Sequence, residues 1–264
     1  MLKVCDVEVI PLCDAVGPMG PALRRPVEET FPGAAPELWE RMRAEEPAAF
    51  GPSGEWILRF HCFLLRPPGG GLTLVDTGIG PAGSPAAAWA PVPGRLPAAL
   101  AGAGVAPGDV GTVVLTHLHS DHASGAVVAG APLFPNARHL VQERELAGLR
   151  REGGPVLDAV VRPLLDAGLV DAADGEARLA PDVRAVPTPG HTAGHQSVVL
   201  GDDRLLVAGD VVLHPVQLAD PAVTYLYDDD PARAAATRAD LLARLRARGG
   251  TIAAPHLPRP FVDV

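Results

Sequence analysis

The chain has 264 residues, of which 47% are hydrophobic, and this is enough to bury a full core in a single domain. There are 22 basic and 31 acidic residues, a net charge of −9, and Lys3 is the only lysine. No basic stripe can follow a phosphate backbone, so nucleic acid is excluded as an expected partner.

The amino-terminal sequence MLKVCDVEVIPLC lacks the uninterrupted apolar segment of a signal peptide and is typical of a first strand. No later stretch approaches the roughly 18 apolar residues of a membrane span. Cys5, Cys13 and Cys62 are widely spaced and odd in number, which argues against a disulfide framework and against a cysteine-based zinc site. We therefore expect a cytoplasmic protein with ordinary buried thiols and no membrane partner.

Short apolar runs bounded by Gly, Pro or Asp predict buried strands, and periodic segments between some of them predict helices. The clearest helix is 231–248, with Asp230 as its N-cap and two glycines after its end. Strands come two or three before each helix, which favours a mixed, layered α/β architecture. The predicted strands are 7–11, 72–75, 112–115, 140–141, 183–186, 197–200, 205–207 and 251–253, and the other predicted helices are 36–44, 142–151 and 155–167.

Residues 15–55 form the longest segment without a clear pattern, with many prolines and one short predicted helix. Such a segment in a compact domain is usually functional or mobile. We expect one domain over 1–264, with 15–55 a candidate lid or substrate-selecting segment and a solvated surface excursion as the alternative. Its apolar residues Met19, Leu23, Phe31 and Trp39 are the expected contacts to a substrate.

The sequence THLHSDHASG follows the predicted strand 112–115 and contains His117, His119, Asp121 and His122. Imidazoles and a carboxylate at this density suit divalent metals such as zinc and have little structural use otherwise. Just after a strand, residues 117 and 119 point to the same side, whereas a following turn carries 121 and 122 to a second position. The spacing therefore suggests two metal positions.

Four ligands cannot complete two metal sites, so further ligands are expected at later strand ends. His191 follows strand 183–186, Asp210 follows strand 205–207, and His256 follows strand 251–253. A carboxylate between two metals can bridge them, and this role is assigned to Asp210.

These motifs resemble those of the metallo-β-lactamase superfamily of hydrolases. The similarity rests on HxHxDH, on the TPGHTxGH segment, on an Asp after a hydrophobic strand, on a final His, and on the VDTG turn at 75–78. It implies an αββα metallo-β-lactamase-like sandwich of two mixed β-sheets flanked by helices, with two divalent metal ions, expected to be Zn²⁺, at one edge. By this resemblance one metal is held by His117, His119 and His191, the other by Asp121, His122 and His256, and Asp210 bridges them.

Departures from individual subgroups narrow the chemistry. β-Lactamases of the superfamily generally lack an aspartate at the position of Asp210, which argues against antibiotic hydrolysis. Glyoxalase II enzymes carry a helical carboxy-terminal region, whereas this chain has eight residues after His256. The nucleases of the superfamily add substrate-binding modules or a basic surface, which this acidic chain lacks. The remaining resemblance is to the acyl-homoserine lactonase and organophosphate hydrolase branch. Lactonases of that branch often carry a tyrosine where this chain has Leu213, and His214, Tyr225 or Tyr227 is a candidate replacement.

The expected reaction is hydrolysis of a lactone or other carboxylic ester by a metal-bridging hydroxide, with Asp121 or His214 passing a proton to the leaving group. Thioesters, including those on carrier proteins, and phosphoesters are the alternative substrates. A different class of function is a persulfide dioxygenase with one iron, which the ligands available for a second metal disfavour. A third class is a binding or structural member of the superfamily without catalysis. The expected partner is a small-molecule substrate, and a homodimer is compatible with the sequence.

Other polar residues are expected to support the site or to pack. His195 and Asp76 are candidates to orient metal ligands through hydrogen bonds. The alternative for His195 is packing in a loop, and the alternative for Asp76 is a hydrogen bond to the backbone of its own turn. His61 and His139 are expected to pack on strands. The run 228–230 is expected to cap a helix rather than to bind calcium.

Overall fold

Two sheets form because most of their strands bury apolar side chains on both faces. The computed structural model describes residues 1–264 and contains a seven-stranded sheet of order β1-β2-β3-β4-β5-β8-β9. Strands β4, β5, β8 and β9 run parallel to one another, and β1 to β4 are antiparallel. The strands are β1 Leu2–Val4, β2 Val7–Pro18, β3 Ile57–Arg66, β4 Leu72–Val75, β5 Val110–Val114, β8 Arg138–Gln142 and β9 Val170–Ala173.

The second sheet has six strands in the order β10 to β15. All its pairs are antiparallel except β13 with β14, so both sheets are mixed. Its strands are β10 Ala177–Ala180, β11 Val183–Pro187, β12 Gln196–Leu200, β13 Leu205–Val207, β14 Thr251–Ala253 and β15 Phe261–Asp263, and a separate hairpin pairs β6 Val127–Val128 with β7 Ala131–Pro132.

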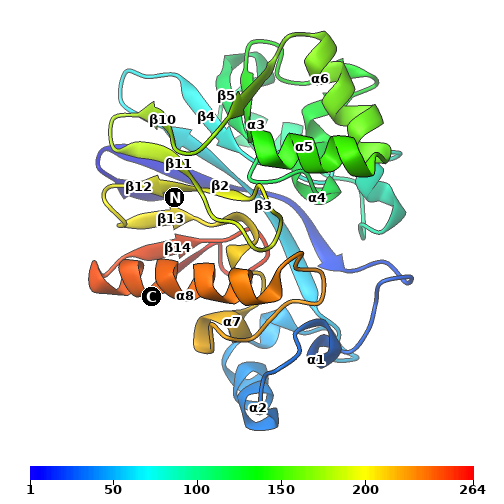
Figure 1. Ribbon diagram of the computed structural model, residues 1–264, viewed down its shortest axis with the longest axis vertical. Helices are drawn as coiled ribbons and strands as arrows, with labels where there is room; N and C mark the ends of the chain where they lie inside the picture. The colour runs from blue at the N-terminus through cyan, green and yellow to red at the C-terminus, as the bar shows by residue number, and fades with distance from the viewer.

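Helices cover the outer faces of both sheets, and Figure 1 shows α3, α5 and α6 grouped on one side and α8 along the other. None of the helices is long and apolar enough to span a membrane. The α-helices are α1 Val27–Thr30, α2 Pro36–Glu45, α3 Leu96–Gly102, α4 Ser120–Ala123, α5 Glu143–Glu152, α6 Arg162–Asp166, α7 Pro215–Ala219 and α8 Pro231–Ala247. The remaining turns are the π-helical η5 Leu157–Val161 and the 3₁₀ turns η1 Pro47–Ala49, η2 Pro85–Ala88, η3 Pro107–Asp109, η4 Ser124–Ala126 and η6 Gly209–Val211.

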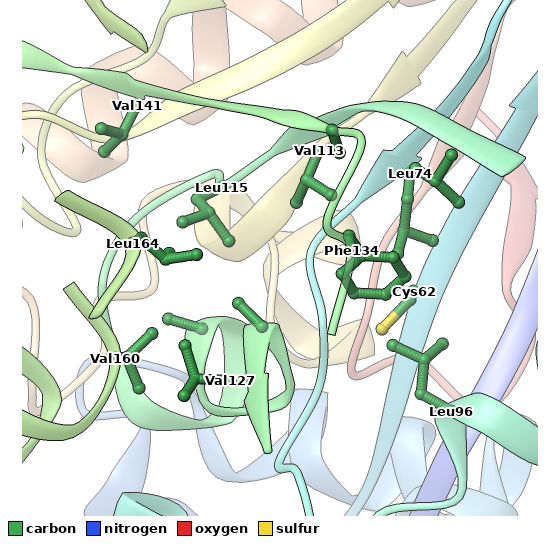
Figure 2. Packing of buried hydrophobic residues seen from close by; sticks show 14 of the residues in the cluster. Cys62, Leu74, Leu96, Val113, Leu115, Val127, Phe134, Val141, Val160 and Leu164 are labelled. Carbon is green, nitrogen blue, oxygen red and sulfur yellow. The ribbon is translucent and has the colours of Figure 1, made fainter. Parts of the chain in front are cut away.

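Side-chain alternation along the strands divides the core into layers. On β12, Val198 and Leu200 face the cluster between the two sheets, whereas Val199 faces Leu241 and Leu245 of α8. A third cluster fills the space between the first sheet and α3, η5 and α6, as Figure 2 shows around Phe134. The order of layers is therefore helix, sheet, sheet, helix, which confirms the αββα expectation.

The predicted strands are all present, and β4, β13 and β14 match their predicted bounds. Helix α8 begins at Pro231, and the Asp230 side chain accepts a hydrogen bond from the Arg233 N–H, so the capping prediction is confirmed. The predicted helix 155–167 is present as the π-helical η5 followed by α6. The longest omission is β3, which continues through Arg59 and His61.

The segment 15–55 is more regular than its sequence suggests. It contains the end of β2, the single turn α1 and the three-turn α2. Phe31 and Trp39 are buried in a cluster with Trp56 and Val216. All three cysteines are free as expected, but Cys5 is exposed rather than buried.

Candidate metal centre

The predicted ligands converge because the strands that precede them end at the same edge of the molecule. β4 and β5 are parallel, and β11, β13 and β14 share one direction within the second sheet. Residues that follow the carboxyl ends of these strands therefore meet at the seam between the sheets. His117 follows β5, and the turn α4 then brings Asp121 and His122 to the same seam.

The seven residues form two groups, in each of which the ligand atoms lie within 4.8 Å of one another. The Asp210 carboxylate lies between the groups. Its Oδ2 is 3.2 Å from His191 Nε2 and 3.8 Å from His117 Nε2, whereas its Oδ1 is 3.2 Å from His122 Nε2 and 3.3 Å from His256 Nε2. The first group is His117, His119, His191 and Asp210, and the second is Asp121, His122 and His256.

The donor set fits divalent metal ions. His117 Nε2, His122 Nε2 and Asp210 Oδ1 are buried and have no hydrogen-bond partner within the protein. Buried polar atoms normally find a partner, and imidazole nitrogens together with carboxylate oxygens are ligands that zinc-like ions accept. Both groups therefore have the burial and chemistry of metal sites.

Burial and neighbouring charges shift the pKa values of the ligand side chains. Burial lowers the pKa of His119 to about 4, and it also lowers the pKa of His117 well below its usual value, so both rings are neutral near pH 7. Burial works to raise the pKa of Asp210, but nearby His122 and His256 outweigh it and hold that pKa well below its usual range. Burial also works to lower the pKa of His122 and His191, but the Asp210 carboxylate outweighs it and raises the pKa of His122 well above its usual value and that of His191 to about 9. Metal binding would therefore displace a proton from each of these two rings.

Asp76 orients His122, as the DTG turn predicted. Its Oδ2 is 2.8 Å from His122 Nδ1, and its two carboxylate oxygens accept hydrogen bonds from the Thr116 N–H and hydroxyl. Asp76 has φ of 60°, a left-handed conformation that is uncommon for a non-glycine residue. The hydrogen bond leaves His122 Nε2 free to point at the site.

His195 supports Asp210 through the backbone. Its Nε2 accepts a hydrogen bond from the Asp210 N–H at 3.0 Å, so its Nδ1 carries the proton and donates to the Thr188 hydroxyl at 2.8 Å. Gly209, with φ of 55°, leaves room for this contact, because a Cβ there would lie 2.6 Å from His195 Nε2. The expected orienting role of His195 is thus met by geometry, although it acts on a main-chain atom.

Two further carboxylates contact the ligand loops and were not singled out for this role from the sequence. Asp228 Oδ1 accepts a hydrogen bond from His191 Nδ1 at 2.9 Å. Glu145, at the start of α5, accepts from the Leu118 N–H, the Thr192 hydroxyl and the Gly194 N–H, and so connects the loop of His117 to the loop of His191. The sequence clue to Asp228 was that it belongs to a run of three aspartates, although one aspartate is enough to cap α8.

An apolar cavity of about 220 Å³ opens above the two groups. The loop after β2 contributes one part of its wall, and the loop after Asp210 contributes another. No lysine or arginine lines it, although Arg25 donates a hydrogen bond to the hydroxyl of Tyr227 at its margin. The lining residues are Met19, Leu23, Trp56, Leu58, Trp89, His119, Ser120, Asp121, His191, Asp210, Leu213, Tyr225, Tyr227 and His256.

The structure does not place His214, Phe31 or Trp39 in this cavity, which corrects those expectations. His214 is fully buried because its Nδ1 caps α7 by accepting the Val216 N–H, and this turns the ring toward Phe31 and Trp39. Of the candidates to replace the lactonase tyrosine, Tyr225 and Tyr227 do line the cavity.

Comparison with known proteins agrees with this geometry. The family model described as the metallo-beta-lactamase superfamily matches residues 61–256. The N-acyl homoserine lactonase AiiA of Bacillus thuringiensis subsp. kurstaki is 33% identical over 111 residues, 42% of this chain and 39% of its own length. The chain thus spans about two fifths of the length of such curated relatives.

Two solved structures share the whole fold. The hydrolase AbOPH of the beta lactamase superfamily has a TM-score of 0.79 and 26% identity, with 98% of this chain and 90% of that chain covered. AidC, a dizinc quorum-quenching lactonase, has a TM-score of 0.78 and 21% identity, with 99% and 92% covered.

Proposed function

We propose that this chain, which belongs to the metallo-β-lactamase superfamily, is a metal-dependent hydrolase that uses two zinc-like ions to open lactones or to cleave other carboxylic esters. The observation that carries the proposal is the position of Asp210, whose two oxygens face separate groups of buried ligands at the floor of an apolar cavity. The similarity to a lactonase supports the choice of substrate class.

In this proposal His117, His119 and His191 would hold one ion, Asp121, His122 and His256 would hold the other, and Asp210, whose oxygens face both groups, would serve both. Bound divalent ions of this kind supply hydroxide at neutral pH and polarise a carbonyl oxygen. The protein fixes the ligands in advance: Asp76 and Asp228 hold the imidazoles of His122 and His191 with Nε2 toward the site.

Asp121 is proposed to carry the proton that reaches the leaving group. It lies in the cavity wall, and its Oδ2 is 3.4 Å from His122 Nε2 and 3.5 Å from His256 Nε2. Burial works to raise the pKa of Asp121, but His122 and His256 outweigh it and the net shift is downward, so the carboxylate is ionised and could accept a proton.

The cavity walls are proposed to recognise an uncharged acyl group. Met19 and Leu23 come from the segment 15–55, which would then serve the single domain 1–264 as a substrate-selecting wall. Aromatic and aliphatic side chains without a lining cation favour an apolar substrate portion of limited size.

A turnover screen of the metal-loaded protein tests this function. Lactones, 4-nitrophenyl esters, thioesters and phosphotriesters should be assayed together with elemental analysis of protein purified without chelators. We expect about two ions per chain and the highest kcat/KM on a lactone or ester. Exclusive turnover of thioesters or phosphotriesters would reassign the substrate, and a single iron with oxygen consumption would reject the proposed chemistry.

A further inference from the structure

Arg238 is buried without being part of the metal groups or the cavity wall. It lies on α8, its exposed fraction is 0%, and it is the largest of the fully buried side chains. A guanidinium cannot be neutralised readily, so burying it is costly unless hydrogen bonds and an opposite charge compensate. Burial lowers the pKa of Arg238 only to about 10, so the group is charged at neutral pH.

The compensation comes from residues 211–228, a loop that contains the short helix α7. Arg238 Nε donates to the carbonyl of Val211 at 2.7 Å, and Nη1 donates to the carbonyls of Pro221 and Val223 at 2.9 and 2.6 Å. Arg238 Nη2 lies 3.9 Å from Asp228 Oδ2. The Arg238 side chain therefore contacts the loop both at its start, next to Asp210, and toward its end, from Pro221 to Asp228.

The same loop joins the cavity wall to a predicted metal ligand. Leu213, Tyr225 and Tyr227 line the cavity. Asp228 Oδ2 accepts a hydrogen bond from the Tyr225 N–H at 3.2 Å, while Asp228 Oδ1 accepts from His191 Nδ1 at 2.9 Å. Movement of this loop would therefore change the aromatic wall and the orientation of His191 together.

We propose that Arg238 is a positioning residue that, with Asp228, sets the distance between the aromatic cavity wall and the metal ligand His191, and so determines which acyl groups are accepted. This inference rests on the proposed esterase function for its kinetic consequence. Its structural consequence, a fixed loop 211–228, does not depend on the substrate.

The test compares Arg238→Lys and Arg238→Met with Arg244→Met, a control on the same helix. Arg244 pairs with Asp203 at 2.8 Å and touches neither the loop nor the cavity. The lysine keeps the charge but cannot reach all three carbonyls, which a planar guanidinium can do. Readouts are hydrogen exchange of residues 211–228, metal content, calorimetric binding of hexanoate and decanoate to the metal-loaded protein, and kcat/KM on 4-nitrophenyl esters from acetate to decanoate.

We expect faster exchange in the loop, unchanged metal content, and a change of about tenfold in the ratio of kcat/KM between long and short esters, with the control like wild type. A matching change in the ratio of decanoate to hexanoate affinity is expected. Wild-type loop exchange and an unchanged chain-length profile in folded Arg238→Lys would overturn the inference, whether or not Arg238→Met folds. If the wild type cleaves no ester, the proposed function fails, and loop exchange and carboxylate binding still decide the role of Arg238.

Discussion

Asp210 is the residue on which the proposed chemistry depends most. Replacing it with Ala removes the only group that faces both ligand groups, so kcat should fall about 100-fold or more while the fold is kept. Steady-state kinetics, circular dichroism and elemental analysis of the same preparation measure this. Near wild-type turnover with both metals bound would show that Asp210 does not bridge.

The control for that variant must lie outside the site. His61→Ala is unsuitable, because His61 Nδ1 is 3.0 Å from the carbonyl oxygen of Pro255, the residue before His256. Asp203→Ala is a better control: it removes a carboxylate whose partner, Arg244, lies on the outer helix. It should leave turnover unchanged.

His139 gives the protein a defined sensitivity to acid. It is buried on β8 with no partner for either ring nitrogen, and burial lowers its pKa from 6.5 to about 4. The folded state resists protonation, so the stability due to neutral His139 is present above pH 6.5 and is lost as pH falls toward 4.

His139→Leu should therefore reduce the loss of unfolding free energy between pH 7 and pH 4.5 by about 2 to 3 kcal/mol. Urea unfolding of chelator-treated protein at both pH values measures the difference without interference from metal release. Equal losses in the variant and the wild type would contradict the assignment.

At the scale of elements, segment 15–55 contains some residues that line the cavity and others that belong to the core. Leu23→Ala should change the preference between short-chain and long-chain esters, with roughly 1 to 3 kcal/mol of discrimination lost for each removed contact. Trp39→Ala should instead destabilise the fold by about 3 to 5 kcal/mol and keep the profile, because Trp39 lies in the core cluster. The opposite pattern would place the substrate against Trp39.

Helix α5 connects the two ligand loops through Glu145. Glu145→Ala should weaken metal binding about 10- to 100-fold and alter the visible spectrum of the cobalt-substituted protein, because Leu118, Thr192 and Gly194 lose their shared acceptor. Glu152→Ala is the matched control, since this exposed carboxylate at the other end of α5 makes none of these hydrogen bonds. Equal metal affinity in the two variants would argue against the connection.

The elements that could be predicted from sequence are those with a local signature. β13 is a short apolar run before Gly and Asp, and α8 has a cap, a proline and a glycine stop. β3 was missed because Arg59 and His61 interrupt the apolar pattern that its central position would otherwise show. Likewise the ligands were found from motifs, whereas the contact of Asp228 with His191 spans 37 residues and has no local signal.

At the scale of the whole molecule, the two ligand groups join the two sheets. His117 and His119 follow the first sheet while His191 and Asp210 follow the second, and the other group likewise combines Asp121 and His122 with His256. An ion in either group therefore links the two halves of the sandwich at one end of their shared core.

Metal removal should thus lower the stability of the whole fold, most of all at the seam between the sheets. An ion present at 100 times its dissociation constant adds about 2.7 kcal/mol, and at about 2 to 4 °C per kcal/mol each ion should raise the melting temperature by roughly 5 to 10 °C. Calorimetry of chelator-treated protein titrated with zinc should show two increments, and hydrogen exchange should slow after β5, β13 and β14 while α6 is unaffected. A single increment that Asp210→Ala leaves intact would mean that only one group binds metal.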